Sequence, residues 1–540
     1  MNILAVIPAR GGSKGIPKKN IRIMNNNPLI FYSINNAKMC NKITDIVVTS
    51  DSDEIIEIAK LYNIDTIKRD SALAKDLTTL DPVIHDATVK MEKNKNKKYD
   101  IVITLQPTSP LLKTQTLKEA LSEFVKSGCD TYISVTSERH LSWGKNGNNF
   151  YPLYKKRVNR QQLQPIFTET GAFFITKREF VKSNSRMGKK ISVYEVPQDE
   201  SVDIDSANDW IICENQLKKK TIVFRVDGYK EIGMGHIYRC ITLAHHLIAH
   251  DIIFATKKQH SEGLEKIKES KFQFKQINDT RDFFKFLKSV KADIVINDCL
   301  DSTAEYITEI KKHAERVITF EDLGTGIEYA DAVINALYEN TGKRDNVFSG
   351  EKYICLKEEF LTEKPVKISE KAKNILVLFG GTDPSNLTKE IYKLALEVTK
   401  LNKDIKFTFL IPLSYDYKKN NIKDAQNIKI ISHVNRVSSY MKEADLAFTS
   451  QGRTVFELAS LGIPSIVLAQ NKREQLHTFA NMQNGFLNLG LGTDVSYETI
   501  KNTFNLLIST YQIRQNMHNL MIKHDLKTGI QRVKNIILGE

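Results

Sequence analysis

The sequence is poor in cysteine and has no long apolar run. Its six cysteines are scattered over 540 residues without a CxxC pair, which excludes a disulfide framework and favours a reducing compartment. No apolar run approaches the roughly 20 residues of a membrane-spanning helix, so no membrane partner is expected. Met1 leads into only a short apolar run, Ile3 to Ile7, which is too short for a secretory signal peptide. These absences together predict a cytoplasmic protein.

Acidic residues are outnumbered by basic ones. The chain has 78 Lys and Arg against 64 Asp and Glu, a formal net charge of +14. Such an excess attracts polyanions or phosphate-bearing substrates. The basic residues are dispersed, however, with no stripe of Lys and Arg interleaved with aromatics, so nucleic acid is not an expected partner. A polyanion-binding role stays open as an alternative that salt-dependent retention of DNA would support.

Strand-like and helix-like segments alternate over roughly residues 1–215. Short apolar runs predict buried parallel strands at residues 3–8, 45–50, 100–107 and 131–135. Amphipathic patterns between them predict helices at residues 28–39 and 53–62. This alternation is typical of a Rossmann-like, three-layer α/β domain with a mainly parallel sheet.

The pattern restarts twice further along the chain. A break at residues 216–220 precedes a new strand at 221–227, and a polar passage at about 357–373 precedes another at 374–381. The second half therefore predicts two Rossmann-like lobes in tandem, with sites at the carboxyl ends of strands or between the lobes. We place the domains at residues 1–219 and 220–540, and the lobes of the second at about 220–370 and 371–540.

The segment IPARGGSKGIPKKN (residues 7–20) has the composition of an anion-binding loop. It follows a predicted strand, and its glycines let backbone N–H groups approach an anion closely. It also carries four cations that suit a triphosphate, namely Arg10, Lys14, Lys18 and Lys19. The pattern GxxxxGK[ST] is absent, so the loop is not a Walker A motif.

Five motifs in order make this first part resemble the CMP-sialic acid synthetase (acylneuraminate cytidylyltransferase) family. They are the loop, KRDSALAKD (68–76), LQPTSPLL (105–112), NRQQL with TGAFFI (159–175), and VDIDSANDW (202–210). The resemblance implies that CTP is bound, that CMP passes to a nonulosonic acid, and that Arg10 and Lys19 are catalytic. It implies nucleotide binding by Gly11, Gly12, Ser13, Lys14, Asn20, Gln106, Thr108 and Ser109, and substrate binding by Arg69, Asp76, Arg160 and Gln161.

Asp203 and Asp205 form the predicted metal site. Aspartates at i and i+2 on an extended segment point the same way and can share one Mg²⁺, and the resemblance implies the same role. Helix capping is the alternative for both, although Ser206 can cap the next helix alone. Catalysis is then expected to come mostly from positioning and charge neutralisation at the phosphates. The general base is not identified by the sequence.

A second glycine turn lies in FRVDGYKEIGMGHIYRC (residues 224–240). Gly233 and Gly235 precede His236, which is expected to open a helix whose N-terminal N–H groups favour a diphosphate. A histidine there can act as a general acid or base near neutral pH, although a lone histidine after such a turn is more often structural. Asp227, just before the turn, has two open readings: it orients substrate, or it caps the turn.

Two later motifs, FGGTDPSN (379–386) and TSQGRTVFEL (449–458), are similar to the UDP-binding half of MurG-like GT-B glycosyltransferases. Together with the GxGHxxR turn they resemble more specifically the UDP-2,4-diacetamido-2,4,6-trideoxy-β-L-altropyranose hydrolases, over about residues 221–540. The resemblance implies a two-lobed GT-B-like domain without a cofactor, in which His236 assists attack of water on a UDP-sugar. It implies UDP binding by Gly233, Gly235, Gly380, Gly381, Ser450, Gly452, Thr454 and Glu457, and substrate contacts by Asp227 and Gln475.

Other functions stay open for the second half: a non-catalytic UDP-sugar-binding module, and a glycosyltransferase that needs an acceptor. The sugar acid is open as well. Gly15 and the QPTSP motif resemble sialic and legionaminic acid synthetases more than pseudaminic ones, whereas the second half points to pseudaminic acid biosynthesis. Related synthetases commonly dimerise, so a homodimer is the expected assembly.

Overall fold

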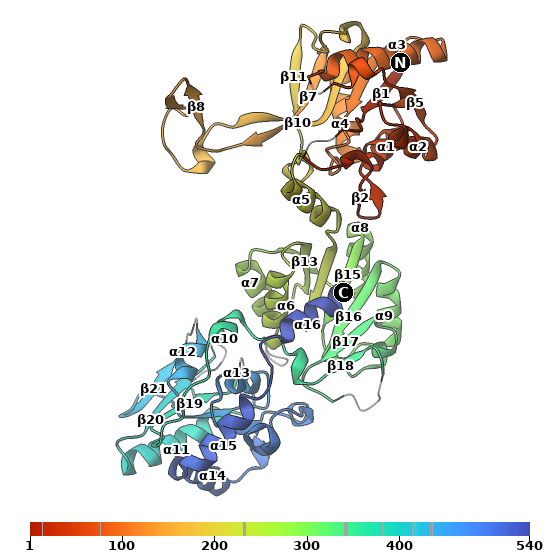
Figure 1. Ribbon diagram of the computed structural model, residues 1–540. Coiled ribbons are helices and arrows are strands. Elements are labelled where there is room, and N and C mark those ends of the chain that lie inside the picture. Colours follow the sequence, from red (N-terminus) through yellow and green to blue (C-terminus); the bar gives the residue numbers. More distant parts are fainter. Residues whose placement is uncertain are drawn as a thin grey trace. The chain divides into compact units, whose positions relative to one another are not determined.

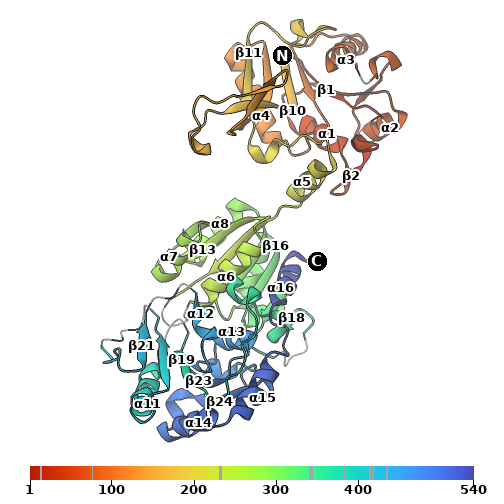
Figure 2. The same ribbon diagram turned by 60° about the vertical axis from the view of Figure 1, so that its left-hand side comes forward.

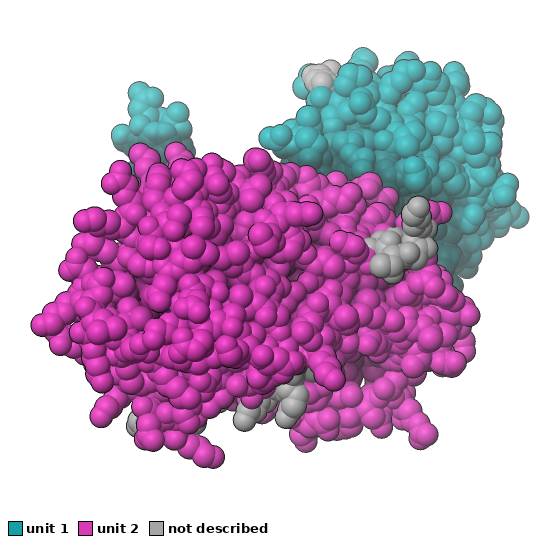
Figure 3. Space-filling view, turned by 90° about the horizontal axis from the view of Figure 1, so that it is seen from below, with its two compact units in different colours: residues 1–219 teal, residues 220–540 magenta. Residues whose placement is uncertain are grey.

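A computed structural model shows the chain divided into two compact units, Met1–Lys219 (unit 1) and Lys220–Glu540 (unit 2) (Figure 3). The structure describes residues 1–12, 15–75, 77–229, 234–339, 344–380, 383–412, 415, 417, 419–432, 434 and 436–540. Five predicted site residues lie outside the described residues: Ser13, Lys14, Asp76, Gly233 and Gly381. Within those described ranges, none of the helices is long and apolar enough to cross a membrane.

Unit 1 is built on one sheet of seven described strands, in the order β11-β7-β10-β6-β1-β4-β5. The strands are β1 (Ile3–Pro8), β4 (Asp45–Ser50), β5 (Asp65–Lys68), β6 (Ile101–Leu105), β7 (Thr131–Glu138), β10 (Ile166–Lys177) and β11 (Ile191–Glu195). At the centre, β1 pairs in parallel with both β4 and β6. The predicted α/β domain with a mainly parallel sheet is confirmed.

Helices cover both faces of this sheet, which explains why all six residues of β1 are buried. Ile3 and Ile7 pack with α1 (Ile30–Met39), α2 (Asp53–Leu61) and α4 (Thr114–Ser127), whereas Leu4 and Val6 pack with α3 (Leu80–Lys95) on the opposite face (Figure 1). Successive side chains of a strand point to opposite faces, so a strand between two helix layers is apolar throughout.

The segment TYISV, now β7, is a buried strand that runs in the same direction as β6 and pairs in parallel with β11, as predicted. The sequence did not predict β10, which lies between β6 and β7 and runs antiparallel to both. The register of β10 shifts between Glu169 and Phe174, where Gly171 has a φ of +69°. Before β10 the chain forms an arm that extends away from the sheet, with strands β8 (Trp143–Asn146) and β9 (Asn149–Pro152) (Figure 1).

The first lobe of unit 2 has a fully parallel sheet in the order β14-β13-β12-β15-β16-β17-β18. Its strands are β12 (Thr221–Val226), β13 (Asp251–Lys257), β14 (Gln273–Ile277), β15 (Ala292–Asp298), β16 (Ala314–Phe320), β17 (Ala332–Asn335) and β18 (Val347–Ser349). α6 (Gly235–His246) and α7 (Ser261–Glu269) pack on one face, and α8 (Thr280–Val290) and α9 (Ala304–Lys311) on the other. The order reverses beside β12, as in Rossmann folds.

The second lobe repeats this plan with the order β21-β20-β19-β22-β23-β24, again parallel. Its strands are β19 (Asn374–Leu378), β20 (Lys406–Leu410), β21 (Ile428–Ile431), β22 (Leu446–Thr449), β23 (Ser465–Ala469) and β24 (Phe486–Leu491). α12 (Val437–Lys442) and α13 (Thr454–Leu461) cover one face, and α11 (Leu387–Leu401) and α14 (Tyr497–Ser509) the other. The predicted pair of Rossmann-like lobes is confirmed.

The last helix does not stay with the second lobe as its expected limits, 371–540, would require. After α15 (Tyr511–Met521), α16 (Gly529–Leu538) packs Ile530, Val533 and Ile537 into the core of the first lobe (Figures 1 and 2). Arg316 Nη2 also donates to the carbonyl oxygen of Ile536 at 2.9 Å. The apolar face of α16 is thus buried by a sheet more than 200 residues earlier in the chain, which local sequence cannot reveal.

Candidate active sites

In unit 1 the predicted anion loop follows β1, and the LQPTSPLL motif begins at the end of β6. β1 and β6 lie side by side, and the strand order reverses between them, which is where parallel α/β sheets bind ligands. Asn20 Nδ2 donates to the carbonyl oxygen of Arg10 at 2.9 Å and ties the two ends of the loop together. The Gly11 N–H donates to Asp51 Oδ1 at 3.0 Å, while Gly12 faces open space.

The VDIDSANDW segment reaches the same edge of the sheet. The Ile204 N–H donates to the carbonyl oxygen of Thr108 at 2.9 Å. Lys19 Nζ donates to the carbonyl oxygen of Ile204 and lies 3.6 Å from Asp205 Oδ1. Lys19, the LQPTSPLL motif and the aspartate pair therefore meet in one place.

Asp203 is the less exposed member of the aspartate pair. Its Oδ1 is buried and has no hydrogen-bond partner among the described residues. Burial raises the pKa of this carboxyl, and the nearby charge of Asp205 also raises it. Gly171, in the bulge of β10, keeps space open beside it, because a Cβ there would lie 3.0 Å from Gln106 Nε2 and 3.2 Å from Asp203 Oδ2.

These residues fit a magnesium ion shared with a substrate. The unpartnered oxygen of Asp203 and the exposed carboxylate of Asp205 are hard oxygen ligands, and Mg²⁺ is usually held by one or two carboxylates together with substrate phosphates. Over the described ranges, no cluster of three or more His, Cys, Asp or Glu could hold a metal by itself. Helix capping does not explain the pair, because Ser206 and Asp209 form the capping box of α5 (Ala207–Leu217).

Two more predicted residues are buried in unit 1, Arg69 near Arg10 and Ser109 in the LQPTSPLL motif. Arg69 is buried, with Nη2 donating to the carbonyl oxygen of Thr49 at 2.8 Å and Nε without a partner in the described structure. Burial lowers the pKa of Arg69, and the charge of Arg10 also lowers it. Ser109 Oγ donates to the carbonyl oxygen of Thr170 at 3.2 Å and so joins β10 to the LQPTSPLL motif.

Arg160 and Gln161, predicted to line the sugar pocket, are placed elsewhere. Both are exposed in the short helix η3 (Arg160–Gln162) beside the arm. Arg160 Nη2 lies 3.5 Å from His140 Nε2, and the carbonyl oxygen of Gln161 accepts from Arg139 Nη1 at 3.0 Å. Their observed partners are arm residues and not the Lys19 cluster.

In unit 2, His236 lies at the start of α6, where the strand order reverses between β12 and β15. Its Nδ1 is 2.5 Å from Oδ1 of Asp298, the last residue of β15. Arg239 donates to the same carboxylate from Nε at 2.7 Å and from Nη2 at 2.6 Å. Burial alone would raise the pKa of Asp298, but the charge of Arg239 and the hydrogen bonds from Arg239 and His236 outweigh it and hold that pKa far below its usual range. The carboxylate orients the imidazole and leaves Nε2 for a substrate proton.

Glu321 extends this network to the strand beyond. It is buried at the end of β16 and accepts from Arg239 Nη1 at 2.8 Å. Burial raises the pKa of Glu321, against the opposing charge of Arg239. Its φ of 50° is sparsely populated by residues other than glycine, and such strain tends to cluster at functional sites. The sequence analysis did not single out Arg239 or Glu321, although the GxGHxxR turn contains the first, and the segment RVITFED (residues 316–322), with its polar end, contains the second.

The carboxylate of Asp227 has several polar partners. It accepts from Arg225 Nη2 at 2.6 Å and from the Lys257 N–H at 3.0 Å, and it lies 3.0 Å from His260 Nδ1. Burial raises its pKa, but Arg225 outweighs this, and the pKa falls to about 2. These groups line a cavity of about 650 Å³ at the carboxyl ends of the first-lobe strands, together with Cys299 and others. Asp227 is therefore placed to orient the groups around the cavity.

Four of the residues predicted to bind UDP lie at the corresponding point of the second lobe, namely Gly380, Ser450, Gly452 and Thr454. Gly380 follows β19, and Ser450 and Gly452 follow the adjacent strand β22. Ser450 Oγ lies 3.8 Å from where a Cβ of residue 380 would be and 3.4 Å from where one of residue 452 would be. Thr454 begins α13, whose free N–H groups favour an anion at this turn.

Glu474 faces this turn, whereas Gln475, which was predicted to contact substrate, does not. Gln475 is exposed. Glu474 Oε2 accepts from the Gln470 N–H at 2.8 Å, and Oε1 lies 3.5 Å from where a Cβ of Gly452 would be. Burial raises the pKa of Glu474 to about 7. The two residues share the short helix η8 (Glu474–Leu476), in which sequence alone does not show the inward side.

Glu457, predicted to hold the ribose, already has an ionic partner. Lys357 Nζ lies 3.1 Å from its Oε1 and also 5.3 Å from the ring centre of Tyr238. Tyr238 belongs to α6 of the first lobe, Glu457 to α13 of the second, and Lys357 to the segment between the lobes. The carboxylate thus lies where the two lobes of unit 2 meet.

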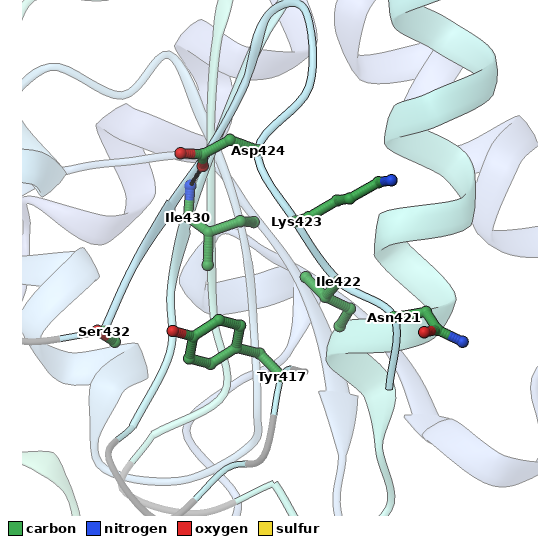
Figure 4. Close-up of a pocket in the computed structure, with 7 residues that line it drawn as sticks. All are labelled: Tyr417, Asn421, Ile422, Lys423, Asp424, Ile430 and Ser432. Carbon is green, nitrogen blue, oxygen red and sulfur yellow. Dashed lines mark hydrogen bonds between the residues drawn. The ribbon is translucent and has the colours of Figure 1, made fainter. Parts of the chain in front are cut away.

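A separate pocket of about 580 Å³ lies at β21, the edge strand of the second-lobe sheet. Figure 4 shows its lining, including Asp424, which accepts a hydrogen bond from the Ile430 N–H at 2.7 Å. None of the predicted site residues lines it. It is therefore unrelated to the clusters described above.

Residues 4–233 match the family model described as cytidylyltransferase. The pseudaminic acid cytidylyltransferase of Campylobacter jejuni is 31% identical over 217 residues, covering 39% of this chain and 93% of that protein. The first part of this chain belongs to the cytidylyltransferase family. Some curated relatives are much longer than the part that matches, and the chain spans 56% of one and 51% of another.

Similarity also extends beyond this cytidylyltransferase unit. The spore coat polysaccharide biosynthesis protein SpsG of Bacillus subtilis is 29% identical over 309 residues, covering 54% of this chain and 90% of that protein. A match over 54% of 540 residues is longer than Met1–Lys219 and so reaches into unit 2. Among solved structures, MurG of Acinetobacter baumannii matches with a TM-score of 0.45 and 15% identity, covering 59% of this chain and 100% of that chain.

Proposed function

We propose that the cytidylyltransferase unit transfers CMP from CTP to a nonulosonic acid of the sialic, legionaminic or pseudaminic type. The observation that carries this proposal is the meeting of Lys19, Thr108 and the aspartate pair where β1 and β6 adjoin. The names of the relatives support the acceptor class, since they include pseudaminic acid and N-acylneuraminate cytidylyltransferases.

In this reaction the anomeric hydroxyl of the sugar acid attacks the α-phosphorus of CTP. A new P–O bond forms as the hydroxyl loses its proton to solvent, the bond between the α- and β-phosphates breaks, and pyrophosphate leaves with the electron pair. Arg10 and Lys19 would neutralise the phosphates, and Lys19 is held in position by Ile204 and Asp205. A Mg²⁺ ion held by Asp203 and Asp205 would supply further charge neutralisation at the phosphates.

Pyrophosphate release tests this proposal directly. The intact chain, CTP and Mg²⁺ are incubated with sialic, legionaminic or pseudaminic acid in turn. Release with one acid, lost in Lys19→Ala and after chelation of the metal, is the expected result. Full activity in both Lys19→Ala and Asp205→Ala would show that the site has been misplaced.

We also propose that unit 2 hydrolyses a UDP-2,4-diacetamido-trideoxyhexose and releases UDP. The His236–Asp298 pair supports a base at the first-lobe turn, and the grouping of Gly380, Ser450 and Gly452 supports a diphosphate at the second. The water oxygen would bond to the anomeric carbon while its proton passes to His236 Nε2. The bond from that carbon to the UDP oxygen breaks, and its electron pair stays on UDP.

Release of UDP without any acceptor distinguishes this function from its two alternatives. Hydrolysis that is lost in His236→Ala is the expected result. A protein that binds UDP but releases none from any UDP-sugar would be a binding module. Release that occurs only with an added acceptor would identify a glycosyltransferase.

A further inference from the structure

Among the residues that the structure describes, Arg453 has no carboxylate partner for its largely buried positive charge. It immediately precedes α13, and its Nη2 donates to the carbonyl oxygen of Cys355 at 2.8 Å. Its Nη1 is buried and has no hydrogen-bond partner, and no carboxylate of the described chain lies within ion-pairing distance of it. Burial lowers the pKa of Arg453, and the charge of Arg239 lowers it further, against the opposing charges of Glu321 and Asp298.

The nearby acidic groups are already occupied. Asp298 binds His236 and Arg239, and Glu321 binds Arg239. Taking a charge out of water is costly unless a counter-charge and hydrogen bonds replace the lost solvation. A guanidinium kept buried with a free N–H therefore points to an anion that arrives from outside the protein.

The position of Arg453 identifies where that anion would lie. The residue follows Gly452 in the second-lobe turn, so its backbone belongs to the predicted diphosphate site. Its Cδ lies 3.4 Å from where a Cβ on Gly235 would be, in the first-lobe turn directly before His236. One side chain thus extends from the turn expected to hold phosphate to the turn that carries the imidazole.

We propose that Arg453 is the residue through which the second lobe binds the diphosphate of the nucleotide sugar beside His236. Its Nη1 donates to an oxygen of the β-phosphate, because a guanidinium is well suited to phosphate and keeps its charge when buried. This inference rests on the proposed hydrolase function. As the bond between the anomeric carbon and UDP breaks, the electron pair remains on the β-phosphate oxygen, where Arg453 offsets the new charge.

Calorimetric titration of the intact chain with UDP tests this role. Arg453→Met should bind UDP at least about tenfold more weakly, the usual cost of losing one charged hydrogen bond, and Arg453→Lys should fall between it and the wild type. Arg436→Met is the matched control, because Arg436 also directly precedes a helix of the second lobe but is paired with Glu363 at 2.7 Å. It should bind UDP like the wild type.

Thermal unfolding of the same variants without ligand provides a second readout. Arg453→Met removes an unpaired buried charge, so its unfolding midpoint should equal or exceed that of the wild type, and this also shows that it folds. Equal UDP affinity in the wild type and Arg453→Met would overturn the role of Arg453 and leave the hydrolase proposal standing. UDP binding that depends on Arg453, without hydrolysis of any UDP-sugar, would support the role of Arg453 and refute the hydrolase proposal. If the Arg453→Met substitution weakened the binding of neither UDP nor pyrophosphate, the inference would be overturned.

Discussion

His236 Nδ1 and Asp298 Oδ1 lie 2.5 Å apart, although 62 positions separate the two residues in the chain. They come together because β12 and β15 are neighbours and both end at the edge where the strand order of the first lobe reverses. The carboxylate, itself held by Arg239, keeps the proton of a neutral imidazole on Nδ1.

Asp298→Asn should reduce the rate constant of UDP release by about a hundredfold or more, because the amide no longer holds the imidazole in the tautomer with a basic Nε2. The affinity for UDP should change only a few-fold, and steady-state kinetics with UDP titration separates the two effects. Asp293→Asn is the control: Asp293 lies near the other end of β15 and accepts from the Thr221 N–H at 2.6 Å. Full activity in Asp298→Asn would contradict the assigned role.

Gly171→Ala should impair CMP transfer while costing only moderate stability. Its φ of +69° is strained for alanine, and the new Cβ would press on Gln106 and Asp203. Gly128→Ala is a close control, with a φ of +67° and no atom within 4 Å of the new Cβ. Both should lose about 1 kcal/mol in the free energy of unfolding from the backbone alone. Only Gly171→Ala should lower pyrophosphate release. An equal loss of pyrophosphate release in both variants would argue against a site next to Gly171.

Asp203→Asn should lose CMP transfer yet become more stable at about pH 8. Burial raises the pKa of Asp203, so the folded protein holds the proton of this carboxyl more tightly than the unfolded chain does. As the pH rises and the carboxyl ionises, the free energy of unfolding therefore falls. Asparagine removes that cost together with the charge that Mg²⁺ requires. Pyrophosphate release and thermal unfolding measure the two effects. Asp199→Asn, which alters an ion pair with Lys113 at 2.9 Å, should leave pyrophosphate release unchanged.

Glu474 should make unit 2 less stable as the pH rises. Burial raises its pKa from 4.5 to about 7, so its stabilising contribution is full below about pH 4.5 and is lost as the pH passes through about 7. The loss is on the order of 3 kcal/mol, since each pKa unit corresponds to about 1.4 kcal/mol. Glu474→Gln should therefore flatten the dependence of the unfolding midpoint on pH, whereas Glu498→Gln, at an exposed position, should not. Identical pH profiles for Glu474→Gln and the wild type would refute this.

Much of the fold could be predicted because its strands are buried on both faces. Such strands appear as continuous apolar runs, and the runs at Ile3–Pro8 and Asp45–Ser50 coincide with β1 and β4. The antiparallel course of β10 and the return of α16 to the first lobe could not be predicted. Both depend on which distant surface a segment packs against, and the periodicity of a segment does not encode that choice.

Some residues of the candidate sites could also be predicted from the sequence, and others could not. Glycine, cation and aspartate motifs marked Lys19, Asp203 and Asp205 because these residue types suit phosphates and magnesium wherever they occur. The motifs were less informative at Arg160, which lies beside the arm, and at Gln475, whose neighbour Glu474 faces the turn instead.

By itself the sequence determined the strand–helix alternation and the residue types that chemistry on nucleotide sugars requires, because both depend on local pattern and side-chain chemistry. Only the tertiary structure decided which of those side chains share a site. It placed Asp298 against His236, buried Arg453 Nη1 without a partner in the described part of the chain, and turned Glu474 inward. Ion pairing and desolvation act over a few ångströms, and neighbours at that range are set by strand order and packing between segments far apart in the chain.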